Sequence, residues 1–466
     1  MERLTLGEIL TAVGGTLLGD ARDLDLTVDR VETDSRTIHA GSLFVPLTGE
    51  RFDGHAYINA ALEGGAAGCL TVRERASYLP GKFYVKVGST MRALRDLAAY
   101  YRDKFDVPVI GITGSVGKTT AKEMTAAVLG TKYEVLKTEG NLNSRVGLPL
   151  TVLNLERRHQ VCVLEMGMNQ PGEIDYLSQI ARPDIAVITN VGDAHIENLG
   201  SRENILKAKS EIFPNVRPGG LAVLNADDEL LCGLRGKLDM DTVFCGRSAQ
   251  ADYRATQVQS DGDHILCRAH TPGGEFSLEI PAPGQHMIYP ALIATAVGER
   301  LGLTREEIAK GILQFRPTKM RMNVLRRAQG ITILNDAYNA NPQSMRAAIS
   351  VLSDDRSSFK LAVLGDMFEL GSLAPALHAG VGEVLGKAKI DCLIAVGELS
   401  AHMAEAARNA GVATVIHCPD KQGAKAAIAE QLRPDSTVLV KASRGMAMEE
   451  LVDELLKLTQ AEQEEK

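Results

Sequence analysis

Hydrophobic residues along the chain form short continuous runs, and longer stretches with helical spacing separate these runs. Short runs with few polar interruptions are typical of strands that are buried on both faces of a parallel sheet. Apolar residues that recur three or four positions apart are typical of helices that cover such a sheet. Because the two patterns alternate through most of the chain, the sequence predicts an α/β protein with mostly parallel sheets and right-handed crossovers.

The central part of the chain, residues 107–316, shows this alternation most clearly. Its predicted strands are 107–112, 161–166, 185–190 and 221–225. At 253–281 the pattern changes to simple alternation, and Asp261-Gly262 is typical of a hairpin turn, so we expect a small antiparallel appendage there. A helix is predicted at 289–301.

Smaller units are predicted on either side of the central unit. In residues 1–106, the strands are expected at 42–46, 68–72 and 83–87, and the helices at 6–13, 55–63 and 91–102. The last of these helices links the first unit to the central one. In residues 317–466, strands are expected at 332–334, 361–364, 393–396, 412–416 and 438–440, with helical patterns between them. The third unit is therefore predicted to be a Rossmann-like, doubly wound domain, and its charged tail, 460–466, is expected to fray.

Length and composition narrow the class of protein. The 466 residues are enough for about three domains, and 45% hydrophobic with 24% charged residues is typical of a globular chain. A formal net charge of −8 disfavours nucleic acid as the main partner. Seven cysteines without a CxxC pair indicate a reducing compartment and no structural zinc. No signal peptide or membrane-length apolar run occurs, so we expect a cytoplasmic protein that does not span a membrane, and a monomer.

One motif of the central unit joins a buried strand, a glycine-rich turn and a helix. It is GITGSVGKTT, residues 111–120. Glycines let backbone N–H groups turn inward, and the helix N-terminus adds partial positive charge, which suits phosphate. Lys118 can reach the β- and γ-phosphates of a nucleotide, and the Thr119 hydroxyl can ligate Mg²⁺. The spacing departs from the common pattern because Ile112 stands where the first glycine is expected. Gly-Lys-Thr at this junction nevertheless favours a nucleotide-binding loop rather than a glycine-rich turn without a ligand.

Polar residues follow several predicted strands at the carboxyl ends, where ligands bind in such sheets. Glu165 could hold the same Mg²⁺, or it could be a solvated carboxylate or a helix cap. His195 could be a metal ligand or a buried, satisfied histidine, and Lys209 is by itself one charge on a solvated helix face. The polar turns at 33–36 and 49–55 could bind a ligand or lie on the surface. From the residues alone these alternatives stay open.

Taken together, the motifs resemble those of the Mur ligases, which build the peptide of bacterial peptidoglycan. The resemblance covers nearly the whole chain. It includes DSRTIHAGSLFVPLTGERFDGH in the first unit, TGSVGKTT, TEGNLNSRVGLPLTVL, EMGMNQPGEI, TNVGDAHIENLGS and KAKSEIF in the second, and NDAYNANPQSM, VLGDMFELG and VLVKASRGMAMEELV in the third. Within the family, NDAYNANP and LGDMFELG resemble the members that add D-alanyl-D-alanine to UDP-N-acetylmuramoyl-tripeptide. An Asp-Asn-Pro-Arg motif, expected in members that add diaminopimelate, is absent from the sequence.

The resemblance implies a role for each matching residue of the central unit. The ATP phosphates are expected against Thr113, Gly114, Ser115, Val116, Gly117, Lys118 and Thr119. Two Mg²⁺ ions are implied, one served by Thr119 and Glu165 and the other by His195. Lys209 matches a lysine that is carbamylated on Nζ, which would turn a cation into a carboxylate suited to a metal. The implied catalytic residues are Lys118, Lys209, His195 and Glu165.

Further roles are implied outside the phosphate loop. Arg321 and Asp336 match residues that meet ATP when the domains close, with Asn339 nearby. Ser35 and Arg36 are expected at the UDP site of the first unit, and Thr138, Asn141 and Asn143 are expected to face the substrate across the cleft. The family's adenine-side asparagines are replaced in GQHMIYP by Met287 and Pro290, so we expect backbone groups or Asn339 to meet the adenine instead.

The resemblance also implies a reaction. ATP converts a carboxylate into an acyl phosphate, and the amine of D-alanyl-D-alanine attacks it, as the last cytoplasmic step of the peptidoglycan peptide precursor. The third unit is expected to close over the cleft and exclude water. The alternatives are another amino-acid-adding Mur ligase, a ligase like folylpolyglutamate synthase, or a regulatory nucleotidase with a phosphate loop. A GTPase is disfavoured because the sequence shows no NKxD guanine motif.

Overall fold

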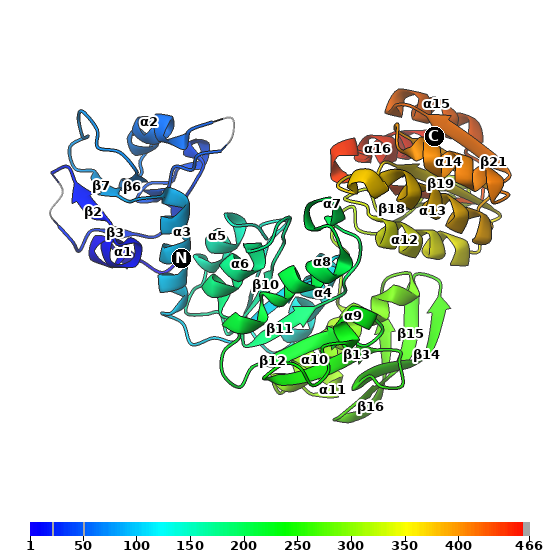
Figure 1. Ribbon diagram of the computed structural model, residues 1–466, viewed down its shortest axis with the longest axis horizontal. Helices are drawn as coiled ribbons and strands as arrows, with labels where there is room; N and C mark the ends of the chain where they lie inside the picture. Colours follow the sequence, from blue (N-terminus) through cyan, green and yellow to red (C-terminus); the bar gives the residue numbers. More distant parts are fainter. Residues whose placement is uncertain (21–22, 50–51, 460–466) are drawn as a thin grey trace, which may run out of the picture.

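The computed structural model describes residues 1–20, 23–49 and 52–459, and it contains three domains that follow one another along the chain (Figure 1). The predicted boundaries at 106/107 and 316/317 lie in connections between the sheets of these domains. The predicted turn at 49–55 is described only in part, because residues 50 and 51 lie outside the described residues, as does the whole predicted tail, 460–466. The first and third domains lie on opposite sides of the central domain (Figure 1).

The first domain is built on a five-stranded sheet in the order β2-β7-β6-β5-β4, in which only the β2–β7 pair is antiparallel. The strands of this domain are β1 (Leu4–Thr5), β2 (Thr16–Leu18), β3 (Thr27–Val28), β4 (Val31–Glu32), β5 (Leu43–Phe44), β6 (Gly68–Thr71) and β7 (Phe83–Lys86). Its helices are α1 (Leu6–Val13), α2 (Ile58–Glu63) and α3 (Thr90–Arg102), with 3-10 turns η1 (Ser35–Thr37) and η2 (Gly54–Tyr57). The predicted elements are confirmed, whereas β1 to β4 are too short to show a pattern in the sequence.

The linking helix α3 joins the first domain to the central one through a buried arginine. Arg102 is fully buried and donates hydrogen bonds to the carbonyls of Phe105 (2.6 Å), Val107 (2.9 Å) and Ala181 (3.3 Å). Burial lowers the pKa of its guanidinium, but these carbonyls satisfy the donors that burial removes from water. The contacts fix the direction in which the chain enters the central sheet.

The central sheet has nine strands in the order β16-β15-β14-β13-β12-β11-β8-β10-β9. They are β8 (Val109–Thr113), β9 (Val135–Lys137), β10 (Val161–Glu165), β11 (Ile185–Ile188), β12 (Leu221–Asn225), β13 (Asp241–Gly246), β14 (Tyr253–Asp261), β15 (His264–Thr271) and β16 (Gly274–Ile280). The hairpin at Asp261-Gly262 is confirmed, but the antiparallel strands extend the main sheet through the β13–β14 pair instead of forming a separate appendage. The strand order reverses at β8, which lies between β10 and β11, and a crevice for ligands is expected at such a point.

Helices cover the central sheet and connect its strands. They are α4 (Lys118–Leu129), α5 (Gly147–Val152), α6 (Glu173–Ala181), α7 (Ile196–Leu199), α8 (Arg202–Ser210), α9 (Glu229–Cys232), α10 (Ile288–Arg300) and α11 (Arg305–Leu313), with 3-10 turns η3 (Phe213–Asn215) and η4 (Gln285–Met287). The central helix α10 has no polar stripe, because it is buried over most of its length against α4 and the sheet.

The third domain is a six-stranded sheet in the order β17-β18-β22-β19-β20-β21, parallel except for the edge strand β17. Its strands are β17 (Asn323–Arg326), β18 (Thr332–Asn335), β19 (Phe359–Gly365), β20 (Cys392–Val396), β21 (Thr414–Cys418) and β22 (Ser436–Lys441). Its helices are α12 (Pro342–Asp354), α13 (Ala374–Lys387), α14 (Ser400–Asn409), α15 (Lys421–Gln431) and α16 (Glu449–Leu458), with 3-10 turns η5 (Ala328–Gly330), η6 (Gly371–Leu373) and η7 (Arg444–Met446). The predicted strands are all confirmed, and β17 is the one that the sequence pattern missed.

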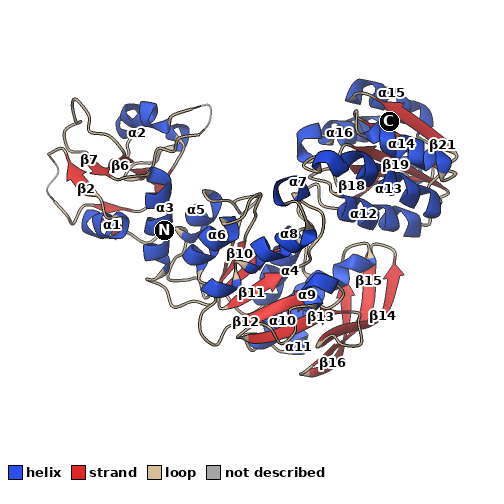
Figure 2. Cartoon of the chain, in the orientation of Figure 1, coloured by secondary structure: helices blue, strands red, loops and turns tan. Residues whose placement is uncertain are grey.

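Helices lie on both faces of the third sheet, as the prediction of a doubly wound domain requires (Figure 2). Successive residues of β19 alternate between two separate cores. Val363 packs with residues of α15 and α16, whereas Ala362 and Leu364 pack with residues of α12, α13 and α14. This alternation explains why the strands of this domain are apolar at nearly every position.

Candidate active site

The predicted phosphate loop connects β8 to α4, at the point where the strand order reverses. Gly114 has φ +150°, and a Cβ at this position would lie 1.9 Å from the Thr189 hydroxyl. Gly117 has φ +81° and ends the loop just before α4. Both positions therefore require glycine, one for space and the other for its conformation.

Asn190, just past β11, fixes the conformation of the phosphate loop through hydrogen bonds. Its side chain accepts a hydrogen bond from the Val116 amide and donates one to the Val116 carbonyl, both 2.9 Å. Its carbonyl accepts from the Ser115 amide at 3.0 Å. The Lys118 ammonium donates to the Gly114 carbonyl at 2.7 Å, and burial lowers its pKa. A cation that is partly stripped of water beside a glycine-rich turn is suited to an anionic phosphate.

Glu165 stands at the carboxyl end of β10, and it is 2% exposed. Its Oε1 accepts a 2.7 Å hydrogen bond from Asn143, but its Oε2 is buried and has no hydrogen-bond partner in the described part of the chain. The Thr113 hydroxyl, at the end of the neighbouring strand β8, is likewise buried without a partner. Such orphaned oxygens fit a hard cation such as Mg²⁺, which binds through oxygen and keeps several waters.

Lys122 supports this carboxylate, and the sequence analysis did not single it out. It is fully buried one turn after Lys118, and its Nζ donates to the Thr138 carbonyl at 2.6 Å. The same Nζ lies 2.8 Å from Glu123 and 4.0 Å from Glu165 Oε2. The only signal in the sequence is its i+4 spacing from Lys118, which puts both lysines on one face of α4.

Thr138 is not placed as predicted. It is fully buried behind Glu165, and its hydroxyl accepts a 3.0 Å hydrogen bond from the Glu165 amide. No surface of Thr138 is left to face a substrate, so its role in this structure is to hold the end of β10. Asn143, which is also predicted to face the substrate, is only partly buried. Its side chain donates a hydrogen bond to Glu165.

Lys209 is brought to this site by α8, and it does not lie on a solvated helix face. It is 1% exposed, and its ammonium has no hydrogen bond or ion pair with any other described residue. Burial, together with the charge of Lys118, holds the pKa of Lys209 well below its usual range. A buried lysine of this kind favours the neutral amine.

His195 precedes α7 in a left-handed conformation, with φ +62°. Its Nδ1 lies 2.6 Å from Glu369 Oε2 of the third domain, although the angle lies outside hydrogen-bond geometry. Contact with His195 lowers the pKa of Glu369. In this structure the predicted metal ligand His195 therefore faces a carboxylate of another domain, and within the described residues no three His, Cys, Asp or Glu side chains form a metal cluster.

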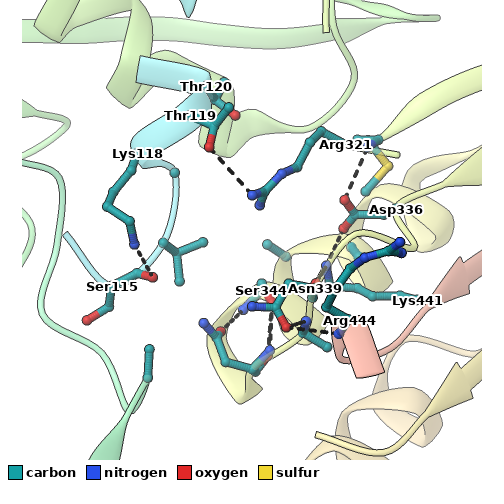
Figure 3. Close-up of a pocket in the computed structure, with 18 of the residues that line it drawn as sticks. Ser115, Lys118, Thr119, Thr120, Arg321, Asp336, Asn339, Ser344, Lys441 and Arg444 are labelled. Atoms are coloured by element: carbon teal, nitrogen blue, oxygen red, sulfur yellow. Dashed lines mark hydrogen bonds and ion pairs between the residues drawn. The ribbon is translucent and has the colours of Figure 1, made fainter. Parts of the chain in front are cut away.

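A cavity of about 410 Å³ lies between the phosphate loop and the third domain, within the usual size range of ligand pockets. Figure 3 shows Lys118 and Thr119 on one side of it, with Arg321, Asp336 and Asn339 on the other. Arg321 Nη2 is 3.5 Å from the Thr119 hydroxyl, and its guanidinium stacks 4.1 Å from the centre of the Tyr338 ring. The structure thus brings together predicted residues from two domains.

The third-domain wall contains cations that the sequence analysis did not assign to the site. Lys441 Nζ donates to Asp336 Oδ2 at 2.5 Å and to the Asn339 carbonyl at 2.9 Å (Figure 3). Burial lowers the pKa of Lys441, although the Asp336 carboxylate opposes that shift. Arg444 also lines the cavity. Lys441 is the last residue of β22, and Arg444 follows it in the KASRG turn, so their position at the end of a parallel strand was the available signal.

A second cavity of about 490 Å³ begins at Val116 and Gly117 on the other side of the phosphate loop. Its lining includes Met287 and Pro290, the two positions that depart from the family pattern. Neither side chain can donate a hydrogen bond, but Asn225, Asp227 and Tyr289 line the same cavity. The Tyr289 hydroxyl donates to Asp227 at 2.9 Å.

The remaining predicted substrate residues lie apart from these cavities. Ser35 and Arg36 form η1 in the first domain, where Arg36 is paired with Asp34 at 2.6 Å on the surface. That pair lowers the pKa of the Asp34 carboxyl to about 2. Asn141 is exposed in the loop before α5. The structure thus brings most of the residues predicted to bind the ATP phosphates to one cavity, and the predicted UDP residues lie in another domain.

Family models match all three domains. A model described as Mur ligase family, catalytic domain, matches residues 27–102. The Mur ligase middle domain matches residues 112–298, and the Mur ligase, glutamate ligase domain matches residues 320–444. The last two matches contain the phosphate loop and the third-domain wall of the cavity.

Similar proteins cover nearly the whole chain. UDP-N-acetylmuramoyl-tripeptide--D-alanyl-D-alanine ligase of Bacillus subtilis (strain 168) is 39% identical over 98% of this chain and 99% of its own. The crystal structure I of MurF from Acinetobacter baumannii has a TM-score of 0.91 at 32% identity, over 98% of this chain and 99% of that one. The MurF ligase from Thermotoga maritima in complex with ADP has a TM-score of 0.83 at 29% identity, over 92% and 97% of the two chains. With all three domains matched and the phosphate loop in place, the chain belongs to the Mur ligase family.

Proposed function

We propose that this protein is an ATP-dependent ligase that adds D-alanyl-D-alanine to UDP-N-acetylmuramoyl-tripeptide in peptidoglycan synthesis. The observation that carries the proposal is the cavity between Lys118 of the central domain and Arg321 of the third, in a chain similar over its full length to ligases of this name. A cavity shared by two domains can bind two substrates and can be closed to water between the two steps.

The reaction has two balanced steps. A carboxylate oxygen of the tripeptide attacks the γ-phosphorus of ATP, so that a P–O bond forms, the bond to the bridging oxygen breaks and ADP leaves. The amine nitrogen of the dipeptide then attacks the acyl carbon, phosphate leaves and the nitrogen loses a proton. Lys118 and the loop amides neutralise and orient the transferring phosphate, which is the main contribution that a protein makes to phosphoryl transfer.

The proposed metal ligands are Thr119 and Glu165 for one Mg²⁺ and His195 for a second, with Lys209 as a carbamate. Bound Mg²⁺ would supply positive charge to the phosphate oxygens. The unpartnered Glu165 Oε2 supports the first position. For Lys209, the lowered pKa favours the neutral amine, and only that form attacks CO₂ to give a carbamate and a released proton.

The two cavities suggest where the nucleotide binds. We place the ATP phosphates against residues 113–119, with Asp336 and Asn339 facing them, and the adenine in the second cavity beside Asn225. We assign the UDP end to Ser35 and Arg36, and we assign Asn141 and Asn143 to contacts with the part of the substrate that reaches toward the cavity. No described helix is long and apolar enough to cross a membrane, and we propose a cytoplasmic monomer.

The test measures phosphate release from ATP and Mg²⁺ with UDP-N-acetylmuramoyl-tripeptide, with and without D-alanyl-D-alanine. We expect release only when both are present, and a pentapeptide product by mass spectrometry. A product in which a single amino acid is added to the tripeptide would be consistent with the family but would overturn the proposed specificity for the dipeptide. Phosphate release that depends on neither the tripeptide nor the dipeptide would rule out the ligase reaction. Release that requires a folate and glutamate would indicate a ligase like folylpolyglutamate synthase.

A further inference from the structure

The cavity between the phosphate loop and the third domain has an uneven charge pattern. The described residues that line it include the cations Lys118, Arg321, Lys441 and Arg444. In the described part of the lining, carboxylates come only from Asp336 and Glu369. Cations suit the phosphates of ATP and the carboxylates of the other substrates, so the two carboxylates require a separate explanation.

Asp336 is already engaged within the third domain. Its Oδ2 accepts from Lys441 at 2.5 Å, and its Oδ1 accepts from the Met322 amide at 3.1 Å (Figure 3). The Glu369 side chain is 49% exposed, and its partner among the described side chains is His195, at 2.6 Å. Of the two carboxylates, Glu369 is thus the one that can meet a ligand.

Hydrogen bonds within the third domain fix the loop that carries Glu369. The Met367 amide donates to His378 Nε2 at 2.9 Å, and the Phe368 amide donates to the Ser443 hydroxyl at 2.8 Å. Asp366 Oδ1 accepts from the Ser400 amide at 2.7 Å and from its hydroxyl at 2.6 Å. Glu369 itself has φ +63°, a left-handed conformation that is strained for a glutamate. The fold therefore holds this carboxylate at the cavity at some cost.

We propose that Glu369 binds the α-ammonium group of the incoming dipeptide. The inference rests on the proposed function, in which the dipeptide enters the cavity as a cation at its amino end. A salt bridge to Glu369 would bring the nitrogen next to His195, on the same side of the cavity as the phosphate loop. The ammonium would then replace His195 as the partner of Glu369 and leave the imidazole free. Glu369 is assigned to binding and orientation, so that dipeptides with a free amino group are selected.

The test compares wild type with Glu369→Gln, which removes the charge and keeps the shape. We expect the KM for D-alanyl-D-alanine to rise about tenfold or more, the loss expected for one charge-assisted contact. The KM values for ATP and for the tripeptide should stay within about twofold of wild type, and so should the single-turnover yield of acyl phosphate without dipeptide, trapped by borohydride reduction. Glu369→Asp, which keeps the charge on a shorter side chain, should give an intermediate KM.

A matched ligand separates binding from a general disturbance of the site. N-Propionyl-D-alanine has the shape of the dipeptide but no amino group, so its inhibition constant should be the same for wild type and Glu369→Gln. If N-propionyl-D-alanine inhibited Glu369→Gln more weakly than wild type, the assignment would be overturned. The control protein is Glu398→Gln, an exposed carboxylate after β20 that does not line the cavity, and its KM for the dipeptide should not change.

Several other kinetic results would overturn the assignment of Glu369. An unchanged KM for the dipeptide in Glu369→Gln would overturn the proposal. So would a rise in the KM for the tripeptide instead. Loss of the trapped acyl phosphate would place Glu369 in the first step and overturn the proposal as well. If the wild type itself makes no pentapeptide, the proposed function fails, and the assignment of Glu369 fails with it.

Discussion

A single buried lysine shows how far a residue's chemistry depends on its surroundings. Lys209 follows Lys207 by two positions on α8, yet Lys207 is exposed whereas Lys209 is 1% exposed. Burial of an unpaired cation costs several kcal/mol unless the group loses its charge. The low pKa of Lys209 is therefore the physical reason why this lysine, and not its neighbour, is suited to carbamylation.

We predict that Lys209→Ala reduces turnover by about a hundredfold or more, the range in which loss of a metal ligand or its support falls. Because alanine leaves a space where the carbamate would be, short carboxylic acids such as acetate should restore part of the rate. The measurement is pentapeptide formation as a function of acetate concentration. Lys207→Ala should keep full activity, and the absence of any rescue of Lys209→Ala would count against carbamylation.

At the scale of elements, one lysine ties together a helix and two strand ends. Lys122 on α4 contacts Thr138 after β9, and it lies 4.0 Å from Glu165 at the end of β10. Its close partner Glu123 has a lowered pKa, because hydrogen bonds from Lys122 and Lys137 outweigh the opposing effect of burial. The position of the Glu165 carboxylate thus depends on the contact between α4 and its neighbouring strands.

We predict that Lys122→Met lowers the free energy of unfolding by about 3 kcal/mol, since it removes the buried cation that binds the Thr138 carbonyl and lies beside the buried carboxylate of Glu165. Urea denaturation followed by circular dichroism would measure the change. Lys137→Met is the matched control, because Lys137 pairs with the same Glu123 but is 32% exposed, and it should cost about 1 kcal/mol or less. Equal effects of the two substitutions would contradict the special role of Lys122.

The loop between β19 and η6 depends on a neutral histidine. His378 is fully buried, and burial lowers its pKa below the ordinary value of 6.5. Its Nδ1 lies 2.7 Å from the Ala374 carbonyl and acts as donor, which leaves Nε2 to accept from the Met367 amide. Protonation of Nε2 would remove this acceptor.

The direction of the pH effect follows from the lowered pKa. The unfolded chain takes up a proton on His378 near pH 6.5 whereas the folded protein does so only at lower pH, so its contribution to stability is complete above that pH and is lost as the pH falls. His378→Gln keeps an acceptor for the Met367 amide without titrating. We predict that melting temperature falls less between pH 7.5 and 5.5 in this variant than in wild type, by differential scanning fluorimetry. Parallel pH profiles would contradict the prediction.

For the whole molecule, the third domain contacts two residues of the central domain that we propose as ligands of the metal. Arg321 reaches Thr119, and Glu369 reaches His195, in each case across the cavity. A further polar contact between the two domains is the 4.0 Å separation of Arg346 and Asp193 beside the second cavity. Contacts of this kind are weak and can be exchanged for contacts with a ligand.

We predict that a non-hydrolysable ATP analogue with Mg²⁺ and the tripeptide draws the third domain toward the central one. The radius of gyration from small-angle X-ray scattering should fall when all three are added, and it should fall less with the nucleotide alone. Lys118→Ala is the control, since we expect it to bind phosphate more weakly, and it should show little change. A radius of gyration that does not respond to the complete set of ligands would contradict domain closure.

The sequence by itself determined the fold class, the phosphate loop and most strands of the central and third domains. Buried parallel strands are apolar at nearly every position, and glycine, lysine and threonine have few reasons to stand together at a strand-to-helix junction. These signals are local, so they can be recognised without knowledge of contacts between distant segments of the chain. Short strands such as β1 to β4 and the edge strand β17 carry too few residues for such a signal.

Only the tertiary structure decided which polar residues act together. Burial of Lys209, the support of Glu165 by Lys122, the inward position of Thr138 and the meeting of His195 with Glu369 all join segments far apart in the chain. The sequence could place each of these residues near a strand or helix end but could not say what faced it, because desolvation and charge depend on all the elements that pack around a group. The electrostatics of the site are therefore set by how the elements of the central and third domains pack together, whereas the fold class is set by the local sequence pattern.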